Sequence, residues 1–186
     1  MNKKIVIFIS GKGSNAKNLI NYFSDNKELV ISHVFSNNKH SDLNSYLLNT
    51  KVQYFLFEEK EISGRVFDEL KKINPKLIIL AGFLKKIPPS YLSFFKNKII
   101  NIHPSLLPKY GGKGMYGSNI HKKVIQNKES ESGITIHYVS KEYDAGKIIF
   151  QKKIKVDKND TPKKLEEKIH KLEYEYFPKI VESLLT

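Results

Sequence analysis

Cysteine is absent from this chain of 186 residues, and its absence excludes disulfides, thiolate metal sites and a cysteine nucleophile. Long apolar runs are also absent, since none approaches the roughly 20 residues that a membrane-spanning helix needs. The amino terminus "MNKKIVIFIS" has a basic start and a short apolar run, but no small-residue cleavage site precedes "GKGSN". We therefore expect a first strand in place of a signal peptide, and a globular protein of the cytoplasm.

Arginine is almost absent as well. Of the 32 Lys and Arg side chains, only Arg65 is an arginine, although arginine is the preferred residue for bidentate contacts to phosphate and guanine. The net charge of +13 still indicates an anionic partner. Because the lysines are scattered, the charge is typical of a solvated basic surface, with small anionic substrates and nucleic acid as the alternatives.

Short β-rich runs alternate with helical patterns in the first half of the chain. The expected strands are 5–9, 29–35, 52–57, 77–80 and 99–102. The expected helices are 14–23, 43–48, 66–73 and 88–95. This alternation predicts a mostly parallel sheet with helices on both faces. Ser14 is a plausible N-cap for the first helix.

The second half of the chain differs. Two strands, 134–139 and 148–156, flank the hairpin-length segment "SKEYDAGK". A long amphipathic helix is expected from about residue 161, and Pro178 is expected to kink or interrupt it. Its expected apolar face comprises Leu165, Ile169, Leu172 and Tyr176. We see no break in composition, so residues 1–186 are predicted to form one α/β domain with an open, mostly parallel twisted sheet, a C-terminal strand pair and a long C-terminal helix.

The segment "SGKGSNA" follows the first strand and opens the first helix. Gly11, Gly13 and Ala16 fit the loose dinucleotide pattern G-x-G-x-x-G/A. The second strand ends in "VFSNN" without the acidic residue that binds ribose hydroxyls, which disfavours a dinucleotide. We therefore predict a single phosphate held by Gly13, Ser14 and Asn15, because glycines let the backbone approach and a helix start offers N–H groups. The alternative is a tight turn that only begins a helix.

Asn101 and His103 in "NIHP" lie two residues apart at a strand end, so their side chains share one face. Both can donate a hydrogen bond to a developing oxyanion when His103 is protonated, and His103 can also pass a proton. Asp144 in "EYDAG" would raise the pKa of His103 if it lies beside it. The alternative is a buried, hydrogen-bonded histidine with no catalytic role.

An amide, an imidazole and a carboxylate at one sheet edge suit acyl transfer without a covalent intermediate. No G-x-S-x-G elbow supplies a serine nucleophile. No metal is expected, because ligand spacing is missing around the other histidines considered, which are His33, His40, His121 and His137.

Five segments occur in an order that carries a resemblance over essentially the whole chain: "SGKGSN", "LAGFLKKI", "NIHPSLLPKYGGKGMYG", "GITIHYV" and "EYDAGKII". The chain resembles the phosphoribosylglycinamide formyltransferase family, folate-dependent enzymes of purine synthesis with a Rossmann-like fold. The resemblance implies transfer of the formyl group from 10-formyltetrahydrofolate to the amine of 5'-phosphoribosylglycinamide. The products are formylglycinamide ribonucleotide and tetrahydrofolate, in de novo IMP biosynthesis.

The resemblance also implies the catalytic roles. Asn101 and protonated His103 stabilise the tetrahedral oxyanion, while Asp144 keeps His103 charged and orders a water that relays the proton. It further implies a cis Leu107–Pro108 peptide bond.

The family's binding residues match positions of this chain. Those that match its ribonucleotide contacts are Gly13, Ser14, Asn15, His170 and Glu173. Those that match its folate contacts are Arg65, Leu84, Lys85, Lys86, Ile87, Asn101, Ser140, Lys141, Glu142, Tyr143 and Asp144. Two positions depart from the family: His170 is often Gln in relatives, and Ser63-Gly64-Arg65 replaces a Ser-Arg pair, so either Gly64 or Arg65 takes the folate-contact position.

Three alternatives share part of this pattern. Methionyl-tRNA formyltransferase has the same kind of catalytic domain, but we expect no room here for its C-terminal barrel. Formyltetrahydrofolate hydrolase has an additional N-terminal domain that we also do not expect here. A basic α/β module that binds nucleic acid would need aromatic residues interleaved on a basic face. Among partners we therefore expect the two small substrates, no membrane and no nucleic acid, with the chain as a monomer or homodimer.

Overall fold

The computed structural model describes residues 2–41 and 43–186. The elements along the described chain are β1 Lys3–Ile9, α1 Ser14–Tyr22, β2 Leu29–Ser36, α2 Leu43–Leu47, β3 Gln53–Leu56, the 3-10 helix η1 Glu59–Glu61, α3 Arg65–Ile73, β4 Leu77–Leu80, α4 Pro89–Phe94, β5 Ile99–His103, α5 Ser118–Gln126, β6 Glu131–Tyr138, β7 Ile148–Lys155 and α6 Pro162–Ser183. The expected alternation of strands and helices is confirmed in the first half, with boundaries that shift by one or two residues.

The strands of the described residues form one sheet in the order β3-β2-β1-β4-β5-β6-β7. β1 pairs in parallel with β2 and with β4, and β2 pairs in parallel with β3. β6 and β7 pair antiparallel. The predicted fold class, an open and mostly parallel α/β sheet with a C-terminal strand pair and a long C-terminal helix, is confirmed. Two compact units are distinguished, residues 1–100 with 181–186, and residues 101–180.

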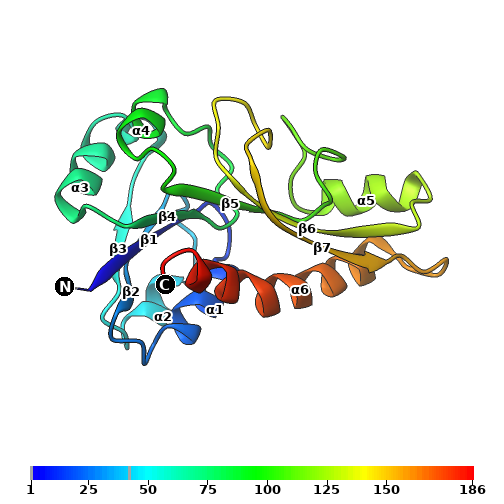
Figure 1. Cartoon of the computed structure of the whole chain (residues 1–186), viewed down its shortest axis with the longest axis horizontal. Helices are drawn as coiled ribbons and strands as arrows, with labels where there is room; N and C mark the ends of the chain where they lie inside the picture. Colours follow the sequence, from blue (N-terminus) through cyan, green and yellow to red (C-terminus); the bar gives the residue numbers. More distant parts are fainter. Residues whose placement is uncertain (1, 42) are drawn as a thin grey trace. The chain divides into compact units, whose positions relative to one another are not determined.

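In the first unit, the central strands are buried on both faces. Residues Ile5–Ile9 of β1 have no exposed surface, and every residue of β4 is buried. Figure 1 shows why: α1 and α2 cover one side of these strands, and α3 and α4 cover the other. Since both faces need apolar side chains, these strands are continuous apolar runs without polar alternation.

In the second unit, α5 and α6 lie on opposite sides of the β6–β7 pair (Figure 1). Residues 132–137 of β6 are all buried, whereas every residue of β7 is half-buried or exposed. The helix α5 is not among the elements expected from the sequence. Its N-cap is Gly117 with no side-chain cap, and only Ile120, His121 and Val124 of this helix are buried, which leaves a weak helical signal.

Of the two effects expected of Pro178 in α6, a kink or an interruption, the interruption is wrong. The helix runs without interruption from Pro162 to Ser183, so Pro178 does not break it. Phe177 and Val181 on either side of Pro178 are fully buried, and we attribute the continuity to this packing, which offsets the lost backbone hydrogen bond.

The expected apolar stripe of α6 is also displaced. Leu165 and Ile169 are buried as expected, but Glu173 takes the next buried position, whereas Leu172 and Tyr176 are half-buried. The stripe therefore follows a strict spacing of four and places a carboxylate among apolar side chains. Among the described residues, no helix combines the length and apolarity needed to cross a membrane.

Candidate active site

The candidate site begins at the carboxyl end of β5. His103, the last residue of the strand, is buried with 4% of its surface exposed, and Asn101 is half-buried on the same face. The peptide bond between Leu107 and Pro108 is cis, which confirms the expectation from the resemblance.

Both ring nitrogens of His103 have polar neighbours. Nε2 lies 2.8 Å from the carbonyl oxygen of Tyr110, and Nδ1 lies 3.6 Å from Oδ1 of Asp144. Since a carbonyl only accepts, Nε2–H donates to Tyr110, and a proton on Nδ1 would face the carboxylate. These two contacts by themselves favour the imidazolium.

Burial and the contacts with Asp144 and Tyr110 have opposite effects on the pKa of His103. Burial lowers the pKa of the imidazole, and the Asp144 charge and the Tyr110 carbonyl oppose that shift without reversing it. The expectation that Asp144 raises the pKa therefore describes one contribution, whereas burial decides the net direction.

Asp144 is held by its own backbone and by a neighbouring loop. It adopts the left-handed conformation at φ 53°, and its Oδ2 accepts a hydrogen bond from the backbone N–H of Gly112 at 2.9 Å. Burial alone would raise the pKa of this carboxyl. The nearby imidazoles of His137 and His103 and the Gly112 N–H together hold the pKa below its ordinary value, so Asp144 is ionised.

Glycines bring these loops together. A Cβ at Gly146 would lie 1.7 Å from the carbonyl oxygen of Tyr138, so only glycine lets the loop that carries Asp144 close against β6. A Cβ at Gly111 would lie 2.6 Å from Cδ2 of Leu107 and 3.2 Å from Cβ of Asp144. The glycines of "YGG" and "DAG" therefore set the position of the carboxylate.

His137 is a site residue that the sequence analysis did not identify. It is buried with 2% of its surface exposed, its Nε2 lies 3.2 Å from Nδ2 of Asn101 and 3.7 Å from Oδ1 of Asp144, and its Nδ1 lies 2.9 Å from the carbonyl oxygen of Tyr138. From the sequence alone, His137 is a candidate only for metal binding, which its spacing disfavours. A usable signal was present, since His137 is a histidine in an apolar strand directly before the acidic turn.

A second polar group lies on α6 in the same unit. Nδ1 of His170 lies 2.9 Å from Oε2 of Glu173, and this hydrogen bond raises the pKa of His170 against the effect of burial. Glu173 is buried with 4% of its surface exposed. His121 on α5 is also buried, and burial lowers its pKa, while the charges of Glu166 and Glu173 oppose that shift.

The predicted phosphate loop lies in the first unit, directly after β1. Gly13 occupies the N-cap position of α1 with φ 75°, and it makes no side-chain cap. Ser14 is the first helical residue, so the expectation that Ser14 is the N-cap is wrong. A left-handed N-cap favours glycine, and a Cβ at Gly13 would lie 3.0 Å from Leu43 and 3.2 Å from Ile9. Asn15 in the first turn is buried.

The predicted folate residues of the first unit lie in two segments. The N–H of Leu84 donates to Oγ of Ser10 at 3.0 Å, and Ile87 is buried. Lys85 pairs with Glu59 at 2.6 Å, and Lys86 is exposed.

Arg65 is engaged locally. Its guanidinium donates to the carbonyl oxygen of Leu56 at 3.0 Å, pairs with Glu61 at 3.1 Å and lies 4.5 Å from the ring centroid of Phe55. A folate contact by Arg65 would have to coexist with these interactions.

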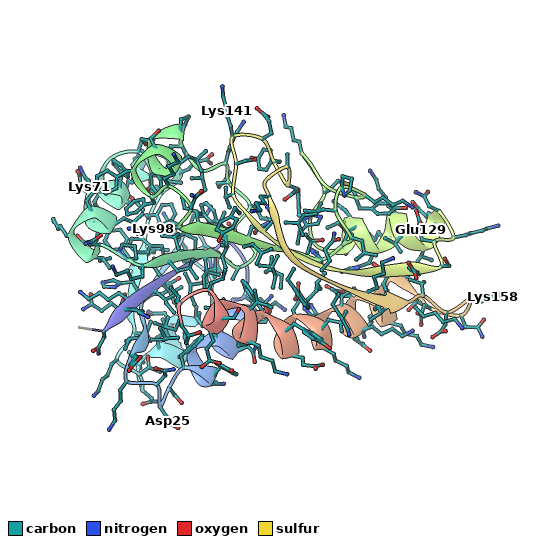
Figure 2. All side chains as sticks on the ribbon, viewed as in Figure 1. Asp25, Lys71, Lys98, Glu129, Lys141 and Lys158 are labelled. Carbon is teal, nitrogen blue, oxygen red and sulfur yellow. The ribbon has the colours of Figure 1, made fainter. Side chains whose placement is uncertain are left out.

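The predicted folate loop of the second unit, residues 140–144, connects β6 to β7. Oγ of Ser140 donates to the carbonyl oxygen of Glu142 at 2.9 Å, and Tyr143 is exposed. Figure 2 shows the Lys141 side chain pointing away from the ribbon at the outer end of this loop. The loop therefore presents its backbone and exposed side chains around the half-buried Asp144.

Among residues 2–41 and 43–186, no group of three or more His, Asp or Glu side chains is arranged to hold a metal ion. The donors present are amides, imidazoles and backbone N–H groups around one ionised carboxylate. Such a set can stabilise an oxyanion and move a proton.

Comparison with known proteins agrees with this chemistry. The family described as formyl transferase matches residues 3–181. The chain belongs to the formyl transferase family.

Its relatives narrow the class. Phosphoribosylglycinamide formyltransferase of Bacillus subtilis (strain 168) is 32% identical, over 98% of this chain and 95% of that protein. The chloroplastic phosphoribosylglycinamide formyltransferase of Arabidopsis thaliana is 35% identical over 96% of this chain, which spans 64% of that protein. The crystal structure of phosphoribosylglycinamide formyltransferase from Anaplasma phagocytophilum has a TM-score of 0.88 at 33% identity, over 98% of this chain and 86% of that one. The resemblance stated from the sequence is confirmed.

Proposed function

We propose that this protein transfers the formyl group of 10-formyltetrahydrofolate to the amine of 5'-phosphoribosylglycinamide. The observation that carries the proposal is the arrangement around Asp144, whose Oδ1 lies 3.6 Å from Nδ1 of His103 and 3.7 Å from Nε2 of His137, which contacts Asn101. The relatives named phosphoribosylglycinamide formyltransferase support this choice of donor and acceptor.

In the proposed reaction, the substrate amine attacks the formyl carbon and a new C–N bond forms. The carbonyl oxygen becomes an oxyanion, which accepts hydrogen bonds from the Asn101 amide and the His103 imidazolium. A water ordered by Asp144 takes a proton from the attacking amine and returns one to the folate nitrogen as the old C–N bond breaks. Neither a metal nor a covalent enzyme intermediate takes part.

His103 has to release one of its present contacts to serve the oxyanion. Its Nε2–H donates to the Tyr110 carbonyl, and its Nδ1 faces Asp144. Tyr110 has φ 57°, a left-handed conformation that is uncommon for a residue with a side chain. We propose that Tyr110 yields when the substrates bind, because the charge of Asp144 is the larger of the two contributions that oppose the loss of the ring's charge on burial.

The ribonucleotide phosphate is proposed to bind Gly13, Ser14 and Asn15. Gly13 gives close backbone approach, and α1 supplies free N–H groups at its start. His170 and Glu173 are proposed to contact the rest of the ribonucleotide.

Folate is proposed to bind the backbone of 84–87, the loop 140–144, and Arg65 or Gly64. Both substrates are anionic, through the phosphate of the ribonucleotide and the glutamate tail of the folate. Part of the net charge of +13 would therefore steer them to the protein.

Residues 1–186 are proposed to work as one formyltransferase domain, because the family match runs from residue 3 to 181 through both compact units. We propose a cytoplasmic protein that acts as a monomer or homodimer. Cell fractionation and sedimentation of the purified chain test these two points.

The experiment that tests the function is a folate deformylation assay in three arms. The purified protein is given 10-formyltetrahydrofolate with the ribonucleotide, with charged initiator tRNA, or with water alone. We expect tetrahydrofolate and formylglycinamide ribonucleotide only in the first arm, and neither with His103→Asn. Equal deformylation in the water arm would identify a hydrolase, and activity confined to the tRNA arm would identify a tRNA formyltransferase.

A further inference from the structure

We propose that His137 is a positioning residue whose neutral imidazole, protonated on Nδ1, holds the Asn101 amide with an N–H group available for the oxyanion. The inference deepens the proposed function, because it concerns how the oxyanion donor of that reaction is oriented. It adds a residue of β6 that touches neither the formyl group nor the attacking amine in the proposed mechanism.

The tautomer of His137 follows from its partners. Nδ1 lies 2.9 Å from the carbonyl oxygen of Tyr138, and since a carbonyl only accepts, Nδ1 carries a proton. Nε2 lies 3.2 Å from Nδ2 of Asn101, and an amide nitrogen only donates, so Nε2 must offer a lone pair. A neutral ring with its proton on Nδ1 satisfies both contacts at once.

Asp144 is the competing partner of the same nitrogen. Its Oδ1 lies 3.7 Å from Nε2 of His137, which is beyond ordinary hydrogen-bond distance, whereas Asn101 is within it. Nε2 can either accept from Asn101 or donate to Asp144, and the distances assign it to Asn101. The carboxylate of Asp144 then remains available to His103.

The hydrogen bond to His137 fixes the orientation of the Asn101 amide. Its amide has two chemically opposite ends of nearly equal shape, an NH₂ group and a carbonyl oxygen. When His137 accepts one N–H, the second N–H stays available on the same nitrogen and the amide cannot rotate without losing this bond. Without the acceptor, the amide can turn its oxygen toward the reacting carbonyl, and that oxygen would repel the oxyanion. A fixed donor is what oxyanion stabilisation requires.

The local backbone aims His137 at this position. The register of β6 and β7 shifts between Ile136 and His137, which pair with Phe150 and Ile148, so Ile149 is the extra residue of a β-bulge. A bulge re-aims the side chains beside it and is common next to active sites. His137 is also 2% exposed, so little water competes for its ring nitrogens.

Two substitutions test the contributions of the two ring nitrogens of His137 separately. His137→Gln keeps an acceptor at the position of Nε2, and His137→Asn keeps a donor only at the position of Nδ1. We expect His137→Gln to stay within about threefold of the wild-type kcat, and His137→Asn to lose about 10-fold to 100-fold, in line with a misaligned oxyanion donor. KM should change by less than about threefold in both, since an interaction made in the transition state affects kcat.

A double-mutant cycle tests whether His137 acts through Asn101. If it does, adding His137→Asn to Asn101→Ala should lower kcat by less than about twofold, because the group being positioned is already gone. Additive losses would overturn the proposal, and so would equal activity of the Gln and Asn variants. Ser132→Ala is the matched control on β6, since Ser132 is 2% exposed and its hydroxyl has no hydrogen-bond partner among the described residues. It should leave kcat unchanged.

A measurement independent of activity separates this proposal from the proposed function. Nitrogen-15 NMR of the labelled wild-type protein should show His137 as the neutral Nδ1–H tautomer, with a coupling between Nε2 and the Asn101 amide that disappears in His137→Asn. The opposite tautomer, or an Asn101 amide signal unchanged in His137→Asn, would overturn the positioning role even if formyl transfer is observed. Conversely, a wild-type protein that catalyses no formyl transfer would refute the proposed function, whereas the NMR result would still show whether His137 contacts Asn101.

Discussion

Oδ1 of Asp144 lies 3.6 Å from Nδ1 of His103, while its other carboxylate oxygen is held by a backbone N–H. The carboxylate thus has one oxygen committed to structure and one facing the imidazole. Burial lowers the pKa of His103, and the charge of Asp144 opposes that shift. The charge state of this imidazole therefore depends on one neighbour more strongly than the charge state of an exposed histidine does.

Replacing Asp144 by Asn should therefore lower the pKa of His103 further. The amide has nearly the same shape, so the loss is chiefly electrostatic, and kcat at neutral pH should fall about 100-fold. Activity should recover partly as the pH is lowered, because acid restores the imidazolium. A pH–rate profile and NMR titration of His103 measure this effect, with His103→Asn as the control that cannot recover. An unchanged His103 pKa in the variant would leave Asp144 with only a role in loop order or water binding.

Replacing Gly13 by Val should weaken ribonucleotide binding. Gly13 has φ 75°, and a side chain there would crowd Leu43 and Ile9 where the backbone is proposed to approach phosphate. We expect the Kd of the ribonucleotide to rise about 10-fold or more, equivalent to about 1.4 kcal/mol, with little change for folate. Calorimetric titration with each substrate measures both. Equal losses for the two substrates would point to a damaged fold, which thermal unfolding of the variant would reveal.

Gly146 should tolerate no side chain. A Cβ there would lie 1.7 Å from the Tyr138 carbonyl, so Gly146→Ala must move the loop that carries Asp144. We expect a loss of about 1–3 kcal/mol in the free energy of unfolding, together with a fall in kcat. Urea unfolding and kinetics test this expectation. Gly11→Ala is the matched control for stability, because its added Cβ meets nothing within 4 Å. Equal stabilities for the two variants would contradict it.

His170 should make ribonucleotide binding depend on pH. Its hydrogen bond to Glu173 raises its pKa, so it is cationic at and somewhat above the usual range for histidine. A cation favours an anionic substrate, and KM for the ribonucleotide should rise as the pH increases and the charge is lost. His170→Gln should show a flatter dependence of KM on pH. Parallel curves for wild type and variant between about pH 6 and 8 would exclude this role.

Protonation of His121 should lower the free energy of unfolding in acid. Burial lowers its folded-state pKa below the unfolded value of about 6.5, so the unfolded chain binds more protons. Its contribution is complete above the unfolded pKa and is lost as the pH falls toward the folded pKa. The free energy of unfolding of His121→Leu should therefore decline less than that of wild type between about pH 7 and 5. Chemical unfolding at several pH values measures this difference, and His40→Gln, at an exposed position, should follow the wild type.

Much of the fold could be predicted from the sequence by itself, because the patterns involved are local. The runs in β1 and β4 are continuously apolar since both faces are buried, and asparagine or proline directly follows β2, α3 and β5. Asn74, which directly follows α3, adopts the left-handed conformation that ends this helix. The candidate catalytic residues could also be predicted from their residue types at a strand end and in a turn, which are Asn101, His103 and Asp144.

Only the tertiary structure decided the remainder. Pro178 lies inside an uninterrupted helix because packing overrides a local propensity, and Glu173 enters the apolar stripe because its partner His170 satisfies it. The role of His137 depends on a bulge between β6 and β7 and on distances to residues far apart along the chain, which no local pattern encodes. The net direction of the His103 pKa is likewise decided by burial, a property of the folded state, whereas the sequence determines only which charged neighbour is available to oppose it.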